Sequence, residues 1–257
     1  MNAVEVKKLT KKYKSNIAVN NIDFTIQEGE LFALLGVNGA GKTTTVRMLC
    51  GLSTPTSGEC FVCGKNCITE RAAVKKIVGI SPQDTAVAEN LTVFENLQLM
   101  CGLYGYSKEQ QDEKIRETMK LFRLDDIKDA KVKTLSGGWK RKVSIAMALI
   151  SEPKVLFLDE PTLGLDVLAR RDLWKILEKL KGNVTMILTT HYMEEAEHLA
   201  DRIAIMMQGK IAVIGTLFDL ENASGKKGLE NVFVEIAEKE IPERYVENSD
   251  ECTRLLE

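Results

Sequence analysis

The segment Gly36–Thr43 constrains the fold more than any other part of the sequence, because it fits the pattern G-x-x-x-x-G-K-[ST] at every fixed position. It follows an uninterrupted apolar run, Leu31–Leu35, which predicts a strand buried on both faces, and a helix is predicted to begin at about Thr43. Glycines let the backbone curl so that successive N–H groups point at phosphate oxygens beside the helix N-terminus. We therefore predict a phosphate-binding loop, in which Lys42 reaches the β and γ phosphates and Thr43 binds Mg²⁺, with an ordinary glycine-rich turn as the alternative.

Two carboxylates follow a second apolar run. Val155–Leu158 predicts another buried strand, and Asp159 and Glu160 come directly after it. In open α/β sheets, ligands bind at the carboxyl ends of the strands. Asp159 is thus predicted to bind Mg²⁺ and Glu160 to polarise water, whereas the alternative is an acidic pair that caps a helix before Pro161.

Composition and the alternation of strands and helices predict an α/β fold with a parallel sheet. The 257 residues are 44% apolar and 28% charged, which is typical of a globular protein that can bury one or two cores. A further buried strand is predicted at Val184–Leu188. Before it, a helix ended by Gly182 is predicted from four apolar residues at helical spacing: Leu173, Ile176, Leu177 and Leu180.

Two segments depart from this alternation. Between Val4 and Ile26 the apolar residues alternate as in strands, which predicts an N-terminal antiparallel β-subdomain. Between about Thr92 and Ala148 the pattern is helical, with breaks predicted at Gly102 and Gly105. This stretch predicts a helical subdomain inserted into the order of the sheet.

The last part of the sequence is less regular. Arg202–Met207 and Lys210–Ile214 predict a closing hairpin through Gln208 and Gly209. Beyond Gly215 the pattern is mixed, and the charge-rich stretch after Glu238 predicts a solvated tail.

The charge balance limits the possible partners. Lys and Arg number 35 and Asp and Glu 37, for a net charge of −2, so no global field favours nucleic acid or anionic lipid, and no nucleic-acid partner is expected. No uncharged apolar run is long enough to span a bilayer, and Met1–Leu9 has neither the basic start nor the apolar stretch of a secretion signal. We expect a cytoplasmic chain.

Six cysteines raise the question of a metal. Cys60, Cys63 and Cys67 have a spacing that zinc or an iron–sulfur cluster uses, but neither a His nor a second cysteine pair lies nearby to complete four ligands. The favoured interpretation is a short hairpin with Gly58 and Gly64 as turn residues and cysteines that pack as small apolar side chains. The other cysteines are scattered, at Cys50, Cys101 and Cys252.

The segment Leu135–Trp139, with the sequence LSGGW, decides among families of phosphate-loop proteins. It resembles the signature motif of ATP-binding cassette (ABC) proteins, and the resemblance extends in the family's order from about Val4 to Gly215. Residues 1–215 are accordingly expected to form one ABC ATPase domain with a helical subdomain at about 87–150, and residues 216–257 a short C-terminal extension. Four more positions match the family: Tyr13 the aromatic residue that stacks on adenine, Gln83 the loop glutamine, Gly164–Asp166 the loop after the second carboxylate, and His191 the switch histidine.

The resemblance implies the following roles, with ATP and Mg²⁺ as cofactors. Glu160 would be the general base, His191 would sense the γ-phosphate, and Lys42 would complete the catalytic set. Mg²⁺ would be held by Thr43, Gln83 and Asp159. Nucleotide binding would involve Tyr13, Gly36, Asn38, Gly39, Ala40, Gly41, Lys42, Thr43, Thr44, Gln83, Ser136, Gly137 and Gly138.

The family also implies partners. Two such domains close around two ATP molecules, as a homodimer or heterodimer, and drive transmembrane permease subunits, so the chain would be peripheral on the cytoplasmic face of the membrane. Leu91–Leu97, Leu165–Asp166 and His191–Glu197 look most like ATPases of drug, antibiotic or lipid exporters. The alternatives are a soluble ABC ATPase that remodels or assembles other complexes, and a P-loop kinase or GTPase, although no N-K-x-D guanine motif occurs.

One position departs from the family pattern, because Trp139 stands where a Gln is usual. With Ser136 as N-cap, a Gln there would complete a capping box that Trp cannot, at a cost of several tenths of a kcal/mol. We expect altered turnover and retained function.

Several residues near these motifs also have simple structural explanations. Tyr13 could close a strand edge, Gln83 could be an ordinary polar loop residue, and His191 could be a hydrogen-bonded core histidine. His198 is predicted to be such a core histidine. Two basic groups, Lys140–Lys142 and Arg170–Arg171, are predicted to be solvated helix faces.

Overall fold

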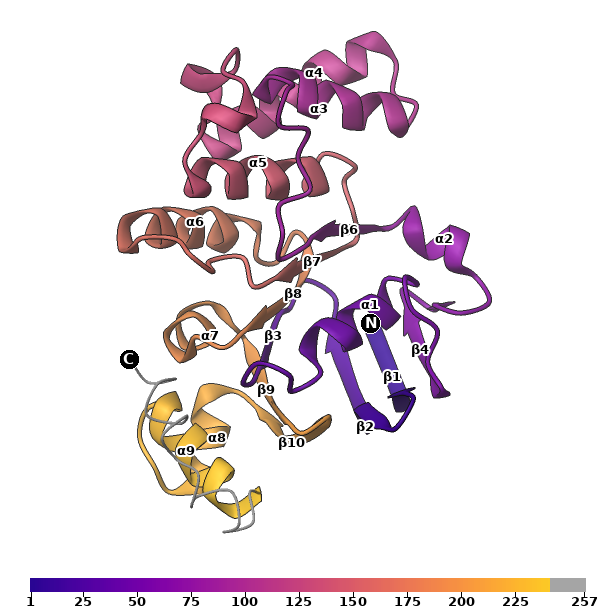
Figure 1. Ribbon diagram of the computed structural model, residues 1–257, viewed down its shortest axis with the longest axis vertical. Coiled ribbons are helices and arrows are strands. Elements are labelled where there is room, and N and C mark those ends of the chain that lie inside the picture. Colours follow the sequence, from indigo (N-terminus) through magenta and orange to yellow (C-terminus); the bar gives the residue numbers. More distant parts are fainter. Residues whose placement is uncertain (241–257) are drawn as a thin grey trace.

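A six-stranded, mostly parallel sheet is the centre of the computed structural model, which describes residues 1–240 (Figure 1). Its strand order is β10-β9-β3-β8-β7-β6, and the predicted strands Leu31–Leu35 and Val155–Leu158 are its β3 and β7. The strands are β3 (Leu31–Leu35), β6 (Val78–Ser81), β7 (Val155–Asp159), β8 (Thr185–Thr190), β9 (Arg202–Met207) and β10 (Lys210–Gly215). The predicted closing hairpin is confirmed, because β9 and β10 pair antiparallel through a turn in which Gln208 and Gly209 both have positive φ.

The two faces of the sheet bury different side chains because residues alternate along each strand. Phe32 and Leu34 pack against α1 (Lys42–Leu49) and the N-terminal β-subdomain. Leu31 of the same strand belongs to a second core with the helical subdomain and α6 (Val167–Leu180). Every residue of β3 is buried, as its continuous apolar run predicts.

The predicted antiparallel sheet is confirmed, with strand order β2-β1-β4-β5. Its strands are β1 (Asn2–Tyr13), β2 (Asn16–Gln27), β4 (Ser57–Val62) and β5 (Lys65–Asn66). The cysteine hairpin is present as β4–β5, with Cys63 and Gly64 at its turn, whereas the predicted turn residue Gly58 lies inside β4 at an irregularity of the β1–β4 pairing. Within residues 1–240 no group of three or more His, Cys, Asp or Glu side chains is placed to hold a metal ion, and Cys252 lies outside the described residues.

The helical subdomain lies at one end of the molecule, at the top of Figure 1. Its main helices are α3 (Val93–Leu103), α4 (Lys108–Phe122) and α5 (Gly137–Leu149), and a short α2 (Arg71–Lys75) precedes β6. Thr92 and Ser107 begin α3 and α4 with full capping boxes. The predicted break at Gly102 is wrong, since α3 continues through it to Leu103, and Gly105, with φ 74°, follows the helix end.

The remaining helices follow the later strands. The predicted apolar stripe of α6 is buried, and the helix ends at Leu180, two residues before Gly182. After α7 (Met193–Leu199), β9 and β10, the chain forms two more helices, α8 (Leu217–Ser224) and α9 (Leu229–Glu240). No element was predicted from the sequence beyond Gly215. The helix α8 packs on β10 and α9, and α9 packs on β9 and α7, in a core that includes Leu220, Leu229, Val232 and Phe233. None of the helices within residues 1–240 is both long enough and apolar enough to cross a membrane; the solvated tail predicted after Glu238 lies almost wholly outside this range.

Candidate active site

The phosphate loop connects β3 to α1 and depends on close backbone packing. A Cβ at Gly36 would lie 2.3 Å from the carbonyl oxygen of Met206, and one at Gly41 would lie 2.4 Å from that of Ala18, so both positions require glycine. Gly41, with φ 107°, is the N-cap of α1, and no side chain caps the helix there. The first N–H groups of α1 therefore face the loop, as an anion site needs.

Lys42 lies buried at the start of α1 and is held by the loop itself. Its Nζ donates to the carbonyl oxygens of Gly36 at 2.7 Å and Val37 at 3.3 Å, and it forms an ion pair with Oε1 of Glu160 at 3.1 Å. Lys42 and Glu160 are each only 5% exposed. A buried ion pair of this kind is favourable only because further hydrogen bonds satisfy the ammonium.

Glu160 is shared between Lys42 and His191. Its other carboxylate oxygen, Oε2, lies 2.8 Å from Nδ1 of His191, the first residue after β8. The backbone of Glu160 has φ 48°, in the left-handed region, and its N–H donates to both oxygens of Thr189 at 3.1 Å. This strained turn at the end of β7 directs the carboxylate toward the phosphate loop.

Asp159 and Thr43 form a second contact across the loop. The hydroxyl of Thr43 donates to Oδ1 of Asp159 at 3.0 Å, and the hydroxyl of Thr189 donates to the same oxygen. A carboxylate and a hydroxyl beside a phosphate loop are the hard oxygen ligands that Mg²⁺ prefers, so this pair suits that cation. The structure thus brings Lys42, Thr43, Asp159, Glu160 and His191 into one site.

Comparison with known proteins decides the family. A sequence model of the family described as ABC transporter matches residues 19–163, which is more than half of the chain. The chain belongs to the ABC transporter family. Its ATP-binding cassette is therefore an ATPase domain, in keeping with the carboxylate, lysine and histidine brought together at the phosphate loop.

Individual members of the ABC transporter family are similar over most of this chain. The human phospholipid-transporting ATPase ABCA3 is 39% identical over 226 residues, which are 86% of this chain but 13% of ABCA3, so the chain spans only a small part of that relative. The daunorubicin/doxorubicin resistance ATP-binding protein DrrA of Streptomyces peucetius is 39% identical over 228 residues, which are 88% of this chain and 69% of DrrA. A solved ATP-binding subunit of an ABC transporter superposes with a TM-score of 0.82 at 30% identity, covering 91% of this chain and 99% of that one.

The ABC signature lies apart from the phosphate loop of its own chain. Ser136 is the N-cap of α5, as expected, and its side chain makes no capping hydrogen bond. Ser136 and Gly137 are exposed, and no hydrogen bond or ion pair within residues 1–240 joins Ser136–Gly138 to the phosphate loop. These groups are available to a second molecule.

Two further predicted nucleotide contacts, Tyr13 and Gln83, are exposed residues on other elements. Tyr13 is the last residue of β1 and is 46% exposed. The Nζ of Lys11 lies over its ring, 4.8 Å from the ring centroid. Gln83 is exposed in the loop after β6, one strand away from β7. No hydrogen bond among the described residues involves the side chain of either residue, and the ammonium of Lys11 covers one face of the Tyr13 ring.

The predicted solvated face at Lys140–Lys142 of this cassette is wrong for two of its three residues. Arg141 is 4% exposed, and its guanidinium donates to the carbonyl oxygen of Pro82 at 2.6 Å and to that of Gln83, while burial lowers its pKa. Ser144, three residues later, lies 3.0 Å from Ser81 on the same face of α5. The three-residue spacing of Arg141 and Ser144, which places them on one face of α5, was the one signal in the sequence that Arg141 faces inward.

Lys142 is also buried and stabilises the start of α5. Its ammonium contacts the carboxylate of Asp172 on α6 and lies 4.3 Å from the ring centroid of Trp139. The ammonium lowers the pKa of Asp172. Trp139, the departure from the family pattern, therefore takes part in packing between α5 and α6.

The prediction that His198 is a core histidine is also wrong. Its side chain is 49% exposed, although its ring lies 4.7 Å from that of Trp174 and its Nε2 is 3.3 Å from Glu178. An aromatic face and a carboxylate on α6 satisfy this histidine at the surface of α7, so no buried partner is needed.

Proposed function

We propose that this chain is the ATP-hydrolysing subunit of an ABC transporter that exports a hydrophobic or drug-like substrate through partner membrane subunits. The observation that supports this most directly is the carboxylate of Glu160, held between Lys42 and His191 beside the phosphate loop. In this assignment Glu160 takes a proton from the attacking water and His191 senses the γ-phosphate through its link to Glu160. Lys42 neutralises charge on the β and γ phosphates.

Mg²⁺ and the remaining nucleotide contacts follow from the same site. Thr43 and Asp159 would hold the ion, with Gln83 reaching in from the loop after β6, and the bound ion would neutralise phosphate charge. Tyr13 offers an exposed ring on which adenine can stack. The remaining phosphate contacts would come from the loop and the first turn of α1, at Gly36, Asn38, Gly39, Ala40, Gly41 and Thr44.

Closure of two cassettes would complete each site. Ser136 and Gly137 are exposed and Gly138 is half-buried, and no hydrogen bond among the described residues joins this segment to its own phosphate loop, so it is suited to bind the γ-phosphate held by a second cassette. A dimeric ATP-binding cassette in a post-hydrolysis state with ADP and Pi superposes with a TM-score of 0.75 at 28% identity, covering 83% of this chain and 98% of that one. The second cassette can be a copy of this chain or a different one.

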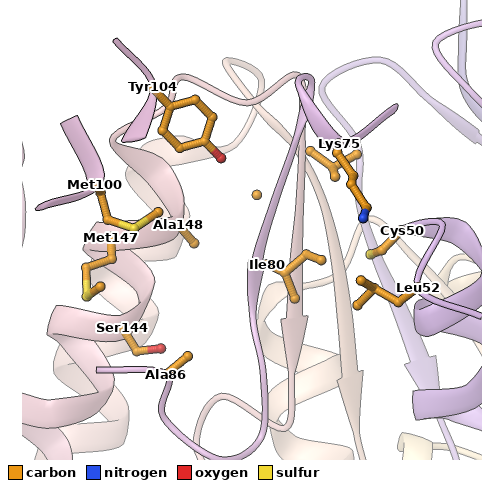
Figure 2. Close-up of a pocket in the computed structure, with 12 residues that line it drawn as sticks. Cys50, Leu52, Lys75, Ile80, Ala86, Met100, Tyr104, Ser144, Met147 and Ala148 are labelled. Atoms are coloured by element: carbon orange, nitrogen blue, oxygen red, sulfur yellow. The ribbon is translucent and has the colours of Figure 1, made fainter. Parts of the chain in front are cut away.

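A pocket between the core and the helical subdomain is suited to the permease (Figure 2). It measures about 400 Å³ and lies between Met100, Tyr104 and Met147 on the helical side and Leu52 and Ile80 on the core side. Leu52, which lines the pocket, is 58% exposed, and Leu103, which directly precedes the lining residue Tyr104, is 73% exposed. Such a patch suits a short cytoplasmic helix or loop of a membrane subunit.

The names of the relatives support export as the direction. One is a phospholipid-transporting ATPase, one a drug resistance protein and one a Nod factor export protein. The membrane partner would hold this chain at the cytoplasmic face.

Purification of the native complex from membranes tests this proposal. We expect transmembrane subunits to copurify with the wild-type chain and to be lost with Leu103→Glu, while Phe218→Glu, a charge placed on the 67% exposed Phe218 of α8, leaves them bound. A chain that copurifies with soluble assemblies only would indicate a remodelling ATPase instead.

A further inference from the structure

Glu195 is the most buried carboxyl group of residues 1–240. It lies on α7, four residues after His191, and its side chain has no exposed surface. The neighbours Glu194 and Glu197 on the same helix are exposed, as a polar helix face would be. Its inward position calls for a specific explanation, because a carboxyl group is rarely buried without a partner.

The surroundings of Glu195 are polar but contain no salt-bridge partner. Nε1 of Trp174 on α6 donates to Oε1 at 3.3 Å. The hydroxyls of Thr162 and Thr190 face the same carboxyl, yet Oε2 of Glu195 and the hydroxyl oxygen of Thr162 are both buried without a well-formed hydrogen bond. A threonine hydroxyl can donate or accept, so it can pair with this oxygen whether the carboxyl is ionised or neutral, and the complete burial of Glu195 without an ion-pair partner in residues 1–240 is what favours the neutral form.

Charge favours the protonated form of this carboxyl. Burial raises the pKa of Glu195, and the negative charge of Glu160 raises it further, against smaller opposite effects of Thr190, Thr162 and Trp174. Arg141 interacts with it only weakly, since Glu195 is the last of three carboxyls that raise the pKa of Arg141, whose guanidinium donates to the carbonyl oxygens of Pro82 and Gln83. No Lys, Arg or His within the described residues forms an ion pair with Glu195.

We propose that Glu195 is a positioning residue of the ATPase site, whose neutral carboxylic acid links Trp174 of α6, Thr162 of the loop after Glu160, and Thr190 at the end of β8. The acid accepts the indole N–H with one oxygen, and its other oxygen donates its single proton to one threonine hydroxyl and accepts from the other. Thr162 lies two residues after Glu160 and Thr190 directly precedes His191, so the acid fixes the backbones that direct both side chains. The proposal rests on the roles assigned above to Glu160 and His191.

Two substitutions separate a neutral positioning acid from a charged group. Glu195→Gln keeps the size, an acceptor oxygen and a donor group in place of the acid O–H, and we expect its kcat for ATP hydrolysis to stay within about twofold of wild type. Glu195→Leu keeps the volume but no hydrogen bond, and we expect kcat to fall about tenfold or more with KM for ATP changed less than about threefold. Glu197→Gln and Glu197→Leu, on the exposed face of α7, are the matched controls.

A spectroscopic readout does not depend on activity. At pH 7, the infrared difference between wild type and Glu195→Gln should contain the C=O stretch of a carboxylic acid, which shifts in heavy water and is missing from the same difference for Glu197→Gln. A carboxylate signal at Glu195, or a loss of kcat in Glu195→Gln equal to that in Glu195→Leu, would overturn the proposal. If Glu160→Gln retains normal turnover, the base assignment fails, whereas the infrared result still reports on Glu195 alone.

Stability as a function of pH gives a third readout. A carboxyl whose pKa is raised on folding stabilises the protein below its unfolded value of 4.5, and that contribution is lost as pH rises through the folded pKa. The unfolding free energy of wild type, measured relative to Glu195→Gln, should therefore decline as pH rises above about 4.5. A difference that stays constant above that pH would mean that Glu195 is ionised in the folded protein.

Discussion

At the scale of single residues, the active site depends on contacts between segments far apart in the sequence. The motifs identified Lys42, Asp159, Glu160 and His191 one by one, because each has a recognisable local pattern. They could not show that one carboxylate is shared by Lys42 and His191, since that depends on how β3, β7 and β8 pair. Burial of Arg141 was missed for the same reason, because its partners are backbone oxygens of a distant loop.

The positions of Lys42 and Glu160 predict different defects. Lys42→Ala should weaken ATP binding about tenfold or more, because it removes charge-assisted contacts to phosphate. Glu160→Gln should still bind ATP but lower kcat by about 10² to 10⁴-fold, because the amide cannot take a proton from water. Equilibrium nucleotide binding and phosphate release measure the two effects separately.

The control for these variants is Glu152→Gln, which neutralises a 70% exposed carboxylate outside the site. It should change neither binding nor turnover. Near-normal phosphate release by Glu160→Gln would remove the general-base assignment.

At the scale of elements, the uniformly buried strands were the elements that the sequence predicted most accurately. The continuous apolar runs of β3 and β7 fix these strands almost to the residue. The helices beyond Gly215 were missed because each buries only a few side chains, such as Leu220 of α8 and Phe233 of α9. The break expected at Gly102 is absent because capping at Thr92 and packing of α3 outweigh the helix penalty of one glycine.

At the start of α5, helix capping and side-chain packing have opposite effects on stability. Trp139→Gln would allow a capping box with Ser136, a gain of about 0.5 kcal/mol, but would lose the packing of Trp139 and its contact with Lys142, a loss of about 1 to 2 kcal/mol. We therefore expect lower stability with turnover altered but retained. Thermal unfolding and ATPase assays measure both, with Trp139→Phe as the control that keeps an aromatic ring. A Trp139→Gln protein that is more stable than wild type would show that capping outweighs packing.

Arg141 connects α5 to the loop that holds Gln83. Arg141→Met should lower the unfolding free energy by about 3 kcal/mol, because two charge-assisted hydrogen bonds to carbonyl oxygens are lost. Arg171→Met, at an exposed position of α6, should change it by less than about 0.5 kcal/mol. Urea unfolding provides the comparison, and equal effects in the two variants would contradict a structural role for Arg141.

At the scale of the whole molecule, one chain presents both halves of a site but does not join them. The phosphate loop lies between the two sheets, while the signature lies at the exposed start of α5. Two chains are therefore expected to share two composite sites.

Mixing of two inactive variants tests this arrangement. Lys42→Ala and Ser136→Arg proteins should each be nearly inactive. If the chain forms homodimers, a mixed dimer of the two variants contains one intact site of two, and about half of the dimers in an equal mixture are mixed, so about a quarter of the activity should return. Phosphate release by the mixture measures this, and if the native partner is a different cassette, it must be present in the assay. Mixed dimers that are demonstrated by pull-down yet remain inactive would exclude a signature that acts across the interface.

Helix α5 has a second place in the topology of the sheet. It packs against both β6 and β7 and is the last element before β7, so it is the crossover that two neighbouring parallel strands require. Its 13 residues form a rod of about 20 Å that begins next to Ser136, and beyond the short turn after Leu149 the chain enters β7, which ends at Asp159. A nucleotide held by a second cassette would thus contact one end of a single helix whose other end leads into the strand of the carboxylates, so we expect occupancy of one composite site to influence the other.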